Sequence, residues 1–252
     1  MPADFVEQFK PIPVRRHDGL FGRLLNAIRL TVDLQLLTCT RFLKPRLART
    51  SGALLDVGCG EMPFRSLLPT SVRYTGIDVP EAMSFGMDEH DDIVTFDGAN
   101  IPFPDASHDA VLCTEVLEHA VDPLKLIQEM HRVLRPGGVC LVTVPFAARV
   151  HHAPYDFHRF TRFRLAAMFS AFNDVEIIER GNDITVIANK LIVLCARLLQ
   201  PKQGWALLYN GVFALLLAPF AVFALACAHL SLVFGWGSKN DPLGYAVTAR
   251  KA

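Results

Sequence analysis

The amino-acid sequence predicts an α/β protein built on a parallel sheet with helices on both faces, and three observations lead to that prediction. First, short apolar runs typical of buried strands recur at 53–59, 74–79, 92–98, 108–114 and 139–145. Second, helical patterns separate them: Asp122 and Pro123 suit a helix start, and Gly137 and Gly138 suit its end. Third, two further apolar runs, at 174–181 and 242–251, provide a sixth and a seventh strand.

The first 50 residues are predicted to form a separate helical region. Residues 1–18 contain three prolines and mixed charge, which indicates irregular structure and excludes a signal peptide. From Leu20 to Leu47 apolar residues recur at helical spacing, with arginines on the opposite side. We therefore expect one or two amphipathic helices with a basic polar face.

Charge is distributed unevenly although the chain is neutral overall. Residues 1–50 carry 9 basic and 4 acidic side chains, residues 51–180 carry 10 and 19, and residues 181–252 carry 6 and 2. The acidic middle argues against a nucleic-acid partner. Basic ends beside apolar segments suit an anionic membrane surface, although solvated helix faces give the same pattern. The six cysteines are scattered and indicate small buried side chains in a reducing compartment.

A glycine turn follows the first strand, and acidic residues follow the next two. Gly58 and Gly60 would let a ligand approach the backbone closely, but the third glycine of a dinucleotide fingerprint is absent. A carboxylate at Asp78 can accept hydrogen bonds from both hydroxyls of a ribose, and one at Asp97 from an exocyclic amine. Each could also be an ordinary turn or cap residue. Together they predict a nucleoside site at the carboxyl edge of the sheet.

Over residues 51–180 the chain resembles a class I S-adenosylmethionine-dependent methyltransferase of the "type 11" group. The resemblance lies in "LLDVGCG", "YTGIDV", "FDGANIPFPDASHDAVLCTEVLEH" and "RVLRPGG", which occur in the family's order. It implies a Rossmann-like seven-stranded sheet whose seventh strand is antiparallel, with S-adenosyl-L-methionine as cofactor. The cofactor-binding residues it implies are Asp56, Gly58 and Gly60 at the methionine end, Asp78 at the ribose, Asp97 with Gly98 at the adenine amine, and Glu115 after the fourth strand. The family often has another glycine where Met62 stands.

The loop after the fifth strand is the candidate acceptor site. It contains His151, His152, Asp156 and His158, and histidine is the side chain best suited to act as a base near neutral pH. Surface or packing roles are the alternative, and Asp156 with Arg159 could instead pin the loop by an ion pair. No metal site is predicted, because a second, distant group of ligands is not evident. A structural role is favoured for His119.

Residues 182–239 form an apolar insertion between strands six and seven. The stretch 205–236 contains no Lys, Arg, Asp or Glu, and Pro219 divides it into helical pieces of about 21 and 25 Å. Both flanking strands belong to one sheet, so we expect a broken or re-entrant pair of helices that returns to its starting side. The preceding helix, 184–199, is expected to lie in a membrane interface. The alternative is a soluble helical cap or the interface of a homodimer.

The predicted organisation is thus a methyltransferase domain at 51–181 and 240–252, a helical region at 1–50 and the insertion at 182–239. The function predicted is S-adenosylmethionine-dependent methylation, at an oxygen, of a lipophilic or lipid-linked small molecule. The enzyme is expected to be cytoplasmic, peripheral or monotopic on the membrane face. Two alternatives stay open: a methyltransferase for a soluble metabolite or sugar, and a non-catalytic cofactor-binding scaffold.

Overall fold

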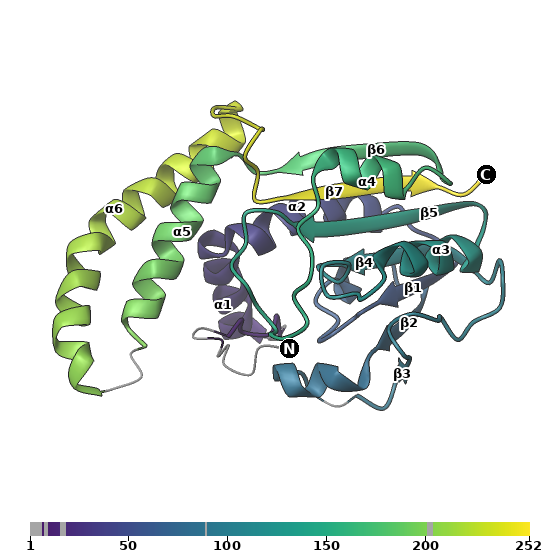
Figure 1. The fold of residues 1–252 in the computed structure, drawn as a ribbon, viewed down its shortest axis with the longest axis horizontal. Helices are drawn as coiled ribbons and strands as arrows, with labels where there is room; N and C mark the ends of the chain where they lie inside the picture. The colour runs from purple at the N-terminus through teal and green to yellow at the C-terminus, as the bar shows by residue number, and fades with distance from the viewer. Residues whose placement is uncertain (1–6, 8–9, 16–18, 89, 201–203) are drawn as a thin grey trace.

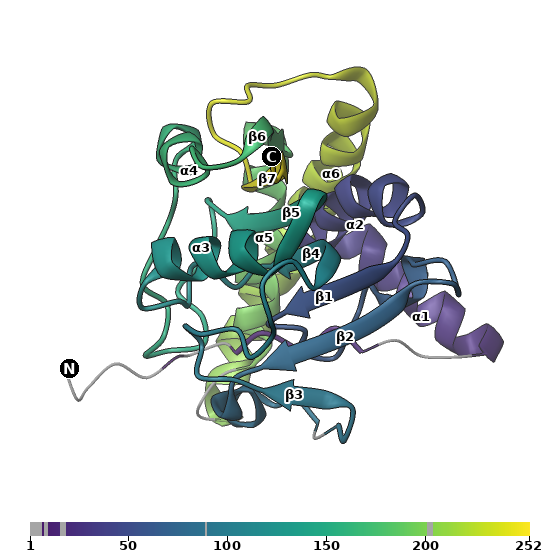
Figure 2. The same cartoon turned by 90° about the vertical axis from the view of Figure 1, so that its right-hand side faces the viewer.

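A single seven-stranded sheet organises the protein, with strand order β3-β2-β1-β4-β5-β7-β6 (Figures 1 and 2). The structure is a computed structural model and describes residues 7, 10–15, 19–88, 90–200 and 204–252. The strands are β1 (Ala53–Val57), β2 (Arg73–Asp78), β3 (Ile93–Thr95), β4 (His108–Thr114), β5 (Leu134–Pro145), β6 (Asn173–Arg180) and β7 (Gly244–Arg250).

Strand β7 is the only antiparallel member of this sheet among the described residues. It lies between β5 and β6 and runs against both, with Val247 opposite Val142 on one side and Ile177 on the other. Strand β6 is therefore parallel to β5, and its carboxyl end lies at the same edge as those of β1, β2 and β4. The predicted seven-stranded sheet with an antiparallel seventh strand is confirmed.

Helices cover both faces of the sheet (Figure 2). Helices α3 (Pro123–Val133) and α4 (Arg162–Met168) lie on one side, and α2 (Leu34–Leu47) lies on the other. Each face has its own apolar core: Leu55 and Val57 pack toward α3 and α4, whereas Leu54 packs toward α2. Two short 3-10 turns, η1 (Arg65–Leu67) and η2 (Pro80–Phe85), belong to the domain, and a third, η3 (Gly204–Ala206), lies in the insertion between β6 and β7.

Helix α3 begins as its sequence predicts and ends earlier. The Asp122 carboxylate accepts a hydrogen bond from the Lys125 backbone N–H at 3.0 Å, and Pro123 is the first helical residue. The helix ends at Val133, because Leu134 already pairs with His108 on β4. The predicted stop at Gly137 and Gly138 is therefore wrong; both glycines lie within β5.

The predicted N-terminal helices are confirmed as α1 (Gly19–Val32) and α2. Asp33 separates them, and its carboxylate caps α2 by accepting from the Leu36 N–H at 3.0 Å. Of the predicted irregular segment, residues 7 and 10–15 have no regular structure and the rest lies outside the described residues. Helix α2 is packed on the sheet, whereas α1 exposes a row of apolar side chains: Leu20, Phe21, Leu24, Leu25 and Ile28.

The insertion between β6 and β7 is an antiparallel hairpin of α5 (Asp183–Leu198) and α6 (Leu207–Phe234), which projects from one end of the sheet (Figure 1). The predicted break at Pro219 is wrong, since α6 is one helix of 28 residues that contains Pro219. Proline removes only one backbone hydrogen bond, and the bonds before and after it hold the helix together. The return to the sheet is therefore made by α5 with α6, and not by two halves of the apolar stretch.

The base of the hairpin is fixed to the domain by polar contacts. The Asn182 side chain caps α5 by accepting from the Thr185 N–H at 3.0 Å, and it donates to the Ser231 hydroxyl and the Trp236 carbonyl. Asp183 accepts from the Ser238 N–H at 2.9 Å. Because these residues lie at both ends of the hairpin, its base has a defined position relative to β6 and β7.

Candidate active site

The glycine turn after β1 is shaped for close approach of a ligand. Gly58 and Gly60 both have positive φ angles, of 68° and 48°. A side chain at Gly58 would overlap Val116, and a Cβ at Gly60 would lie 2.9 Å from the Met87 sulfur. Both positions therefore favour glycine, because a side chain there would overlap residues of the protein itself.

Asp78 borders a pocket at the end of β2. Its carboxylate accepts from the Gly60 N–H at 2.7 Å and from the Val79 N–H at 2.8 Å, which joins the glycine turn to β2. Burial raises the pKa of Asp78 above its ordinary value. Asp78 and Gly60 line a pocket of about 240 Å³ together with η2, including Met83. The pocket lies at the carboxyl edge of the sheet, where the sequence predicts a nucleoside site.

Asp56 is a buried carboxyl group with one unpartnered oxygen. The Tyr74 hydroxyl donates to Oδ2 at 2.7 Å, while Oδ1 has no partner among the described residues. Burial raises the pKa of Asp56 to about 7. A buried acceptor without a donor is uncommon and suits a ligand that supplies a cation or an N–H group.

Asp97 forms a turn after β3. It accepts from the backbone N–H groups of Asn100 and Ala99, at 2.6 and 2.9 Å, and from the Asn100 side chain. The Asn100 N–H in particular lowers the pKa of Asp97 to about 2. Gly98 follows with a φ of 77°. These contacts match the alternative of an ordinary turn residue, and the adenine role stays a prediction.

Glu115, at the end of β4, is paired with an arginine that sequence reasoning missed. Arg180 is buried at the end of β6 and donates to Glu115 at 2.8 Å and to the Val144 carbonyl at 3.0 Å. It also contacts Cys39 of α2. Arg180 thus ties the ends of three strands to a helix. Its only sequence signal is a charge at the end of an apolar strand.

The predicted acceptor loop is held by an ion pair. Arg159 binds both oxygens of Asp156, at 2.6 and 2.8 Å, and the His151 backbone N–H donates to the same carboxylate at 3.0 Å. Burial opposes ionisation, but the hydrogen bonds from Arg159 and His151 hold the pKa of Asp156 below its ordinary value. The loop-pinning role that the sequence left open for this pair is therefore present in the structure.

Three imidazole rings form a cluster beside this loop: His119, His151 and His152, called here the histidine cluster. The ring centroid of His119 lies 4.7 Å from that of His151 and 5.3 Å from that of His152. Burial and the neighbouring rings lower the pKa of His119 to about 4 and that of His152 to about 3. His158 is not part of the cluster; its ring bonds to the Ala120 carbonyl.

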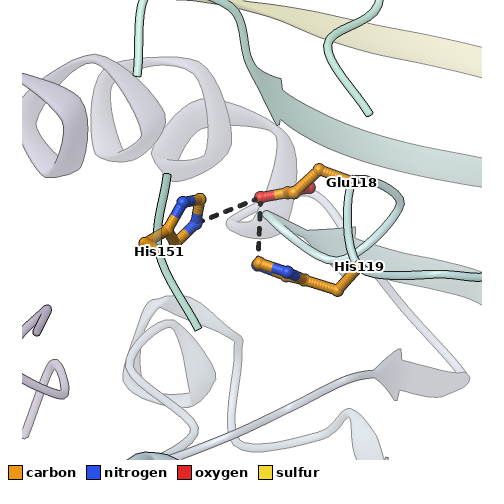
Figure 3. A group of neighbouring side chains, drawn as sticks. All are labelled: Glu118, His119 and His151. Atoms are coloured by element: carbon orange, nitrogen blue, oxygen red, sulfur yellow. Dashed lines mark ion pairs between the residues drawn. The ribbon is translucent and has the colours of Figure 1, made fainter. Parts of the chain in front are cut away.

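Glu118 lies under the histidine cluster and was not singled out from the sequence. Its Oε1 is 3.6 Å from Nε2 of His119 and 3.8 Å from Nε2 of His151 (Figure 3). Burial, and then the charge of Glu115, raise the pKa of Glu118 well above its ordinary value. The nearby His119 belongs to the "EVLEH" motif, but only the fold brings this motif to the loop that follows β5.

Phe85 connects the cofactor pocket with the acceptor loop. It ends η2, which borders the pocket, and its ring centroid is 4.6 Å from that of His152. The two predicted sites are thus adjacent at one edge of the sheet, as methyl transfer between two bound molecules requires.

This sheet, with its glycine turn and antiparallel seventh strand, has the architecture of class I S-adenosylmethionine-dependent methyltransferase domains. Residues 55–142 match the family described as "Methyltransferase domain". The chain is 38% identical over 101 residues to a 27-O-demethylrifamycin SV methyltransferase of Amycolatopsis mediterranei, an alignment of 36% of this chain and 37% of that protein.

A ubiquinone/menaquinone biosynthesis C-methyltransferase of a Geobacter species is 32% identical over 121 residues, covering 40% of this chain and 52% of that protein. The matches thus span about a third to a half of these relatives. A methyltransferase structure from Archaeoglobus fulgidus aligns with a TM-score of 0.53 and 15% identity, over 90% of this chain and 99% of that one, and shows the likeness of fold.

The residues present fit S-adenosyl-L-methionine, the cofactor of this class. Asp78 and Gly60 line the pocket, and Asp56 keeps a buried acceptor without a donor, which suits the cationic and N–H groups of the cofactor. The roles of the individual residues toward each part of the cofactor stay predictions.

Proposed function

We propose that this protein transfers a methyl group from S-adenosyl-L-methionine to an oxygen of a lipophilic or lipid-linked small molecule at a membrane surface. One observation carries the proposal: the apolar hairpin leaves the sheet at the carboxyl end of β6, the edge at which the cofactor pocket lies. Arg180 at that point bonds directly to Glu115. An acceptor held in a bilayer around the hairpin would therefore approach the same edge of the sheet from its β6 side.

The surface of the hairpin is unusually apolar. Leu208, Leu215 and Phe223 of α6 are 80%, 74% and 71% exposed, and further exposed side chains of the same kind follow along the helix. Soluble monomers rarely expose continuous apolar patches of this extent. Among the described residues, α6 is the one helix long and apolar enough to cross a membrane. These features favour lipid as the environment of the hairpin.

The connections of the hairpin favour insertion from one side. Both of its ends return to the same sheet, so a crossing by α6 alone would place β6 and β7 on opposite sides of the bilayer. At 1.5 Å per residue, α6 is about 42 Å long, more than the ~30 Å hydrocarbon core. A monotopic protein on the cytoplasmic membrane face fits these lengths. Helix α1 would be a second apolar contact with the membrane, because it lies beside α6: His229 of α6 is 2.8 Å from the Thr31 carbonyl of α1.

The chemistry assigned to the chain is alignment and proton removal. The cofactor supplies an activated methyl group, so the protein mainly has to orient the acceptor oxygen toward it. His152 is neutral near pH 7 because its pKa is lowered, and a neutral ring can accept a hydrogen bond from a hydroxyl group and so orient it. The ion pair of Asp156 with Arg159 orients the loop that carries His151 and His152. A Geobacter relative named for ubiquinone and menaquinone biosynthesis shares the cofactor domain.

The proposal is tested by incubating the protein with isotope-labelled cofactor and membrane extract, followed by untargeted profiling of the labelled products. We expect label in the lipid fraction with the wild type, and at least about a hundredfold less with His152→Ala or Asp156→Ala. His131→Ala, a change on α3, is the matched control and should retain the label. Label only in water-soluble metabolites would favour the soluble-acceptor alternative, and no label despite measurable cofactor binding would favour the scaffold.

A further inference from the structure

Three atoms with lone pairs converge beneath the acceptor loop without a hydrogen-bond donor between them. The Glu118 side chain is 0% exposed, and neither of its oxygens has a hydrogen-bond partner among the described residues. Nε2 of His119 and Nε2 of His151 face the same oxygen, at 3.6 and 3.8 Å (Figure 3). One ligand atom from each of the three residues lies within 4.8 Å of the others. A buried carboxylate without a partner is costly unless something compensates its charge.

The contacts on the far side of each ring determine which nitrogen carries the proton. Nδ1 of His119 lies 2.8 Å from the Tyr155 carbonyl, and Nδ1 of His151 lies 3.3 Å from the Asp156 carboxylate and 3.2 Å from the Arg149 carbonyl. All of these partners only accept, so in each neutral ring Nδ1 holds the hydrogen and Nε2 presents its lone pair to Glu118. Metal-binding histidines are oriented in the same way by carboxylates and carbonyls behind them.

We propose that Glu118, His119 and His151 bind one first-row divalent transition-metal ion of the Zn²⁺ type. Two imidazole nitrogens with one carboxylate suit such an ion, whereas Mg²⁺ and Ca²⁺ prefer all-oxygen sites. Ligand atoms of a tetrahedral zinc ion are about 3.4 Å apart at bond lengths of about 2.1 Å. The three atoms here lie within 4.8 Å of one another, so binding requires side-chain movements of about 1 Å. Three protein ligands leave a fourth position open, the arrangement of zinc sites that bind a further molecule.

The position of this site explains why sequence reasoning predicts no metal. Glu118 and His119 follow β4 and His151 follows β5, so the second group of ligands is adjacent in space although it is distant in sequence. The ion would join the two segments that border the acceptor side. The proposal does not depend on the identity of the acceptor, and its test needs no methylation assay.

The test measures metal binding by the tag-free full-length protein. After growth with added zinc, elemental analysis should find about one ion per chain, and Co²⁺ added to the chelator-treated protein should give the visible absorption bands of a tetrahedral site. Glu118→Gln and His151→Asn should weaken Co²⁺ binding at least about a hundredfold. Asp156→Asn, behind His151, should weaken it about tenfold. His131→Gln, which removes a histidine elsewhere, should leave binding unchanged.

Failure of the metal proposal would be distinguishable from failure to fold. Circular dichroism and cofactor binding are measured on every variant, and the wild-type result stands by itself if a variant does not fold. The proposal is overturned if the folded wild type holds no ion and gives no Co²⁺ bands, in which case a proton shared between Glu118 and a ring compensates the site. Equal loss of Co²⁺ binding by His131→Gln would also overturn it.

Discussion

The sheet domain and the α5–α6 hairpin place their apolar side chains in opposite environments. In the sheet, Leu54, Leu55 and Val57 are fully buried beneath helices that the chain itself provides. In the hairpin, Leu208, Leu215 and their neighbours point outward along α6. The same hydrophobic effect acts on both regions, so we expect the apolar surface of the hairpin to be covered by an apolar environment such as lipid, whereas the core of the sheet is already covered by helices of the chain.

The two regions are nevertheless joined by polar and apolar contacts. The Asn182 side chain connects the start of α5 with Ser231 and Trp236 at the end of α6, and Leu34, Val186 and Leu243 pack together at the same junction. An apolar surface held in a fixed position relative to β6 differs from a flexible anchor. It would set the orientation of the site edge toward a membrane.

The difference between the two regions is tested by making the same substitution, Leu to Ala, in each of them. Leu55→Ala should lower the free energy of unfolding by about 2–5 kcal/mol, because it leaves a cavity in the core. Leu215→Ala should change it by less than about 0.5 kcal/mol in urea titrations of the protein in mild detergent. A large loss with Leu215→Ala would mean that another part of the protein covers α6, and would count against a lipid-facing hairpin.

The hydrogen bonds of Asn182 at the base of the hairpin should contribute about 2 kcal/mol to the free energy of unfolding. Asn182→Ala removes the cap of α5 and the hydrogen bonds to the Ser231 hydroxyl and the Trp236 carbonyl. We expect faster amide hydrogen exchange in the first turn of α5, with unchanged exchange in β1 and β4. Ser231→Ala is the milder control, since it keeps the Asn182 cap of α5. Equal protection in Asn182→Ala and wild type would show that packing alone holds the hairpin.

Acid should destabilise the sheet domain and spare the hairpin. Asp109 accepts from the Ala53 N–H at 2.7 Å and from Arg135 at 2.6 Å, and these bonds lower its pKa in the folded state. Its stabilising contribution is therefore complete above the unfolded pKa of about 3.9 and is lost as pH falls through the lower, folded value.

Asp109→Asn should cost about 1 kcal/mol near neutral pH, and this difference should shrink on acidification. The measurement is urea unfolding at several pH values, with Asp105→Asn as the exposed control. A cost that stays constant or grows toward low pH would contradict the assignment. Helix α6 has no Asp or Glu, so its helical signal should persist when the sheet domain unfolds in acid with detergent present.

The smallest effect is expected in the glycine turn. Met62 has a φ of 50°, in the left-handed region that favours glycine. Met62→Gly should therefore raise the free energy of unfolding by about 0.5–1 kcal/mol, measured by thermal unfolding. Met62→Ala, which keeps a Cβ, should not be stabilising. If both variants destabilise equally, the packing of the Met62 side chain outweighs the backbone strain.

The sequence predicts the parts of the fold that depend on local patterns. The strands follow from short apolar runs, the start of α3 from Asp122 and Pro123, and the cofactor edge from Gly58, Gly60 and Asp78. The end of α3 is predicted too late, because the pairing of Leu134 with β4 competes with the glycine signal. Pro219 leads to a wrong prediction of a helix break. Proline disfavours helix only locally, and the helical turns on either side of it continue α6.

The candidate site is less predictable, because its contacts are non-local. Arg180 reaches Glu115 across 65 positions in the sequence. Glu118 and His119 come together with His151 only because β4 and β5 are neighbours in the sheet. A single sequence shows which residue types occur, but the partners of each charge are decided by strand order. His158 illustrates the converse, since closeness in sequence to His151 and His152 does not bring it into their cluster.

Flotation with lipid vesicles tests the central claim most directly. The full-length protein is mixed with vesicles of phosphatidylcholine and phosphatidylglycerol and centrifuged in a density gradient, beside a variant in which Leu208, Leu215, Phe220 and Phe223 are all changed to Gln. The account predicts that the wild type floats with the vesicles and that the variant stays at the bottom while still binding S-adenosyl-L-methionine. Wild-type protein that remains at the bottom, as a monomer or a dimer, would contradict it.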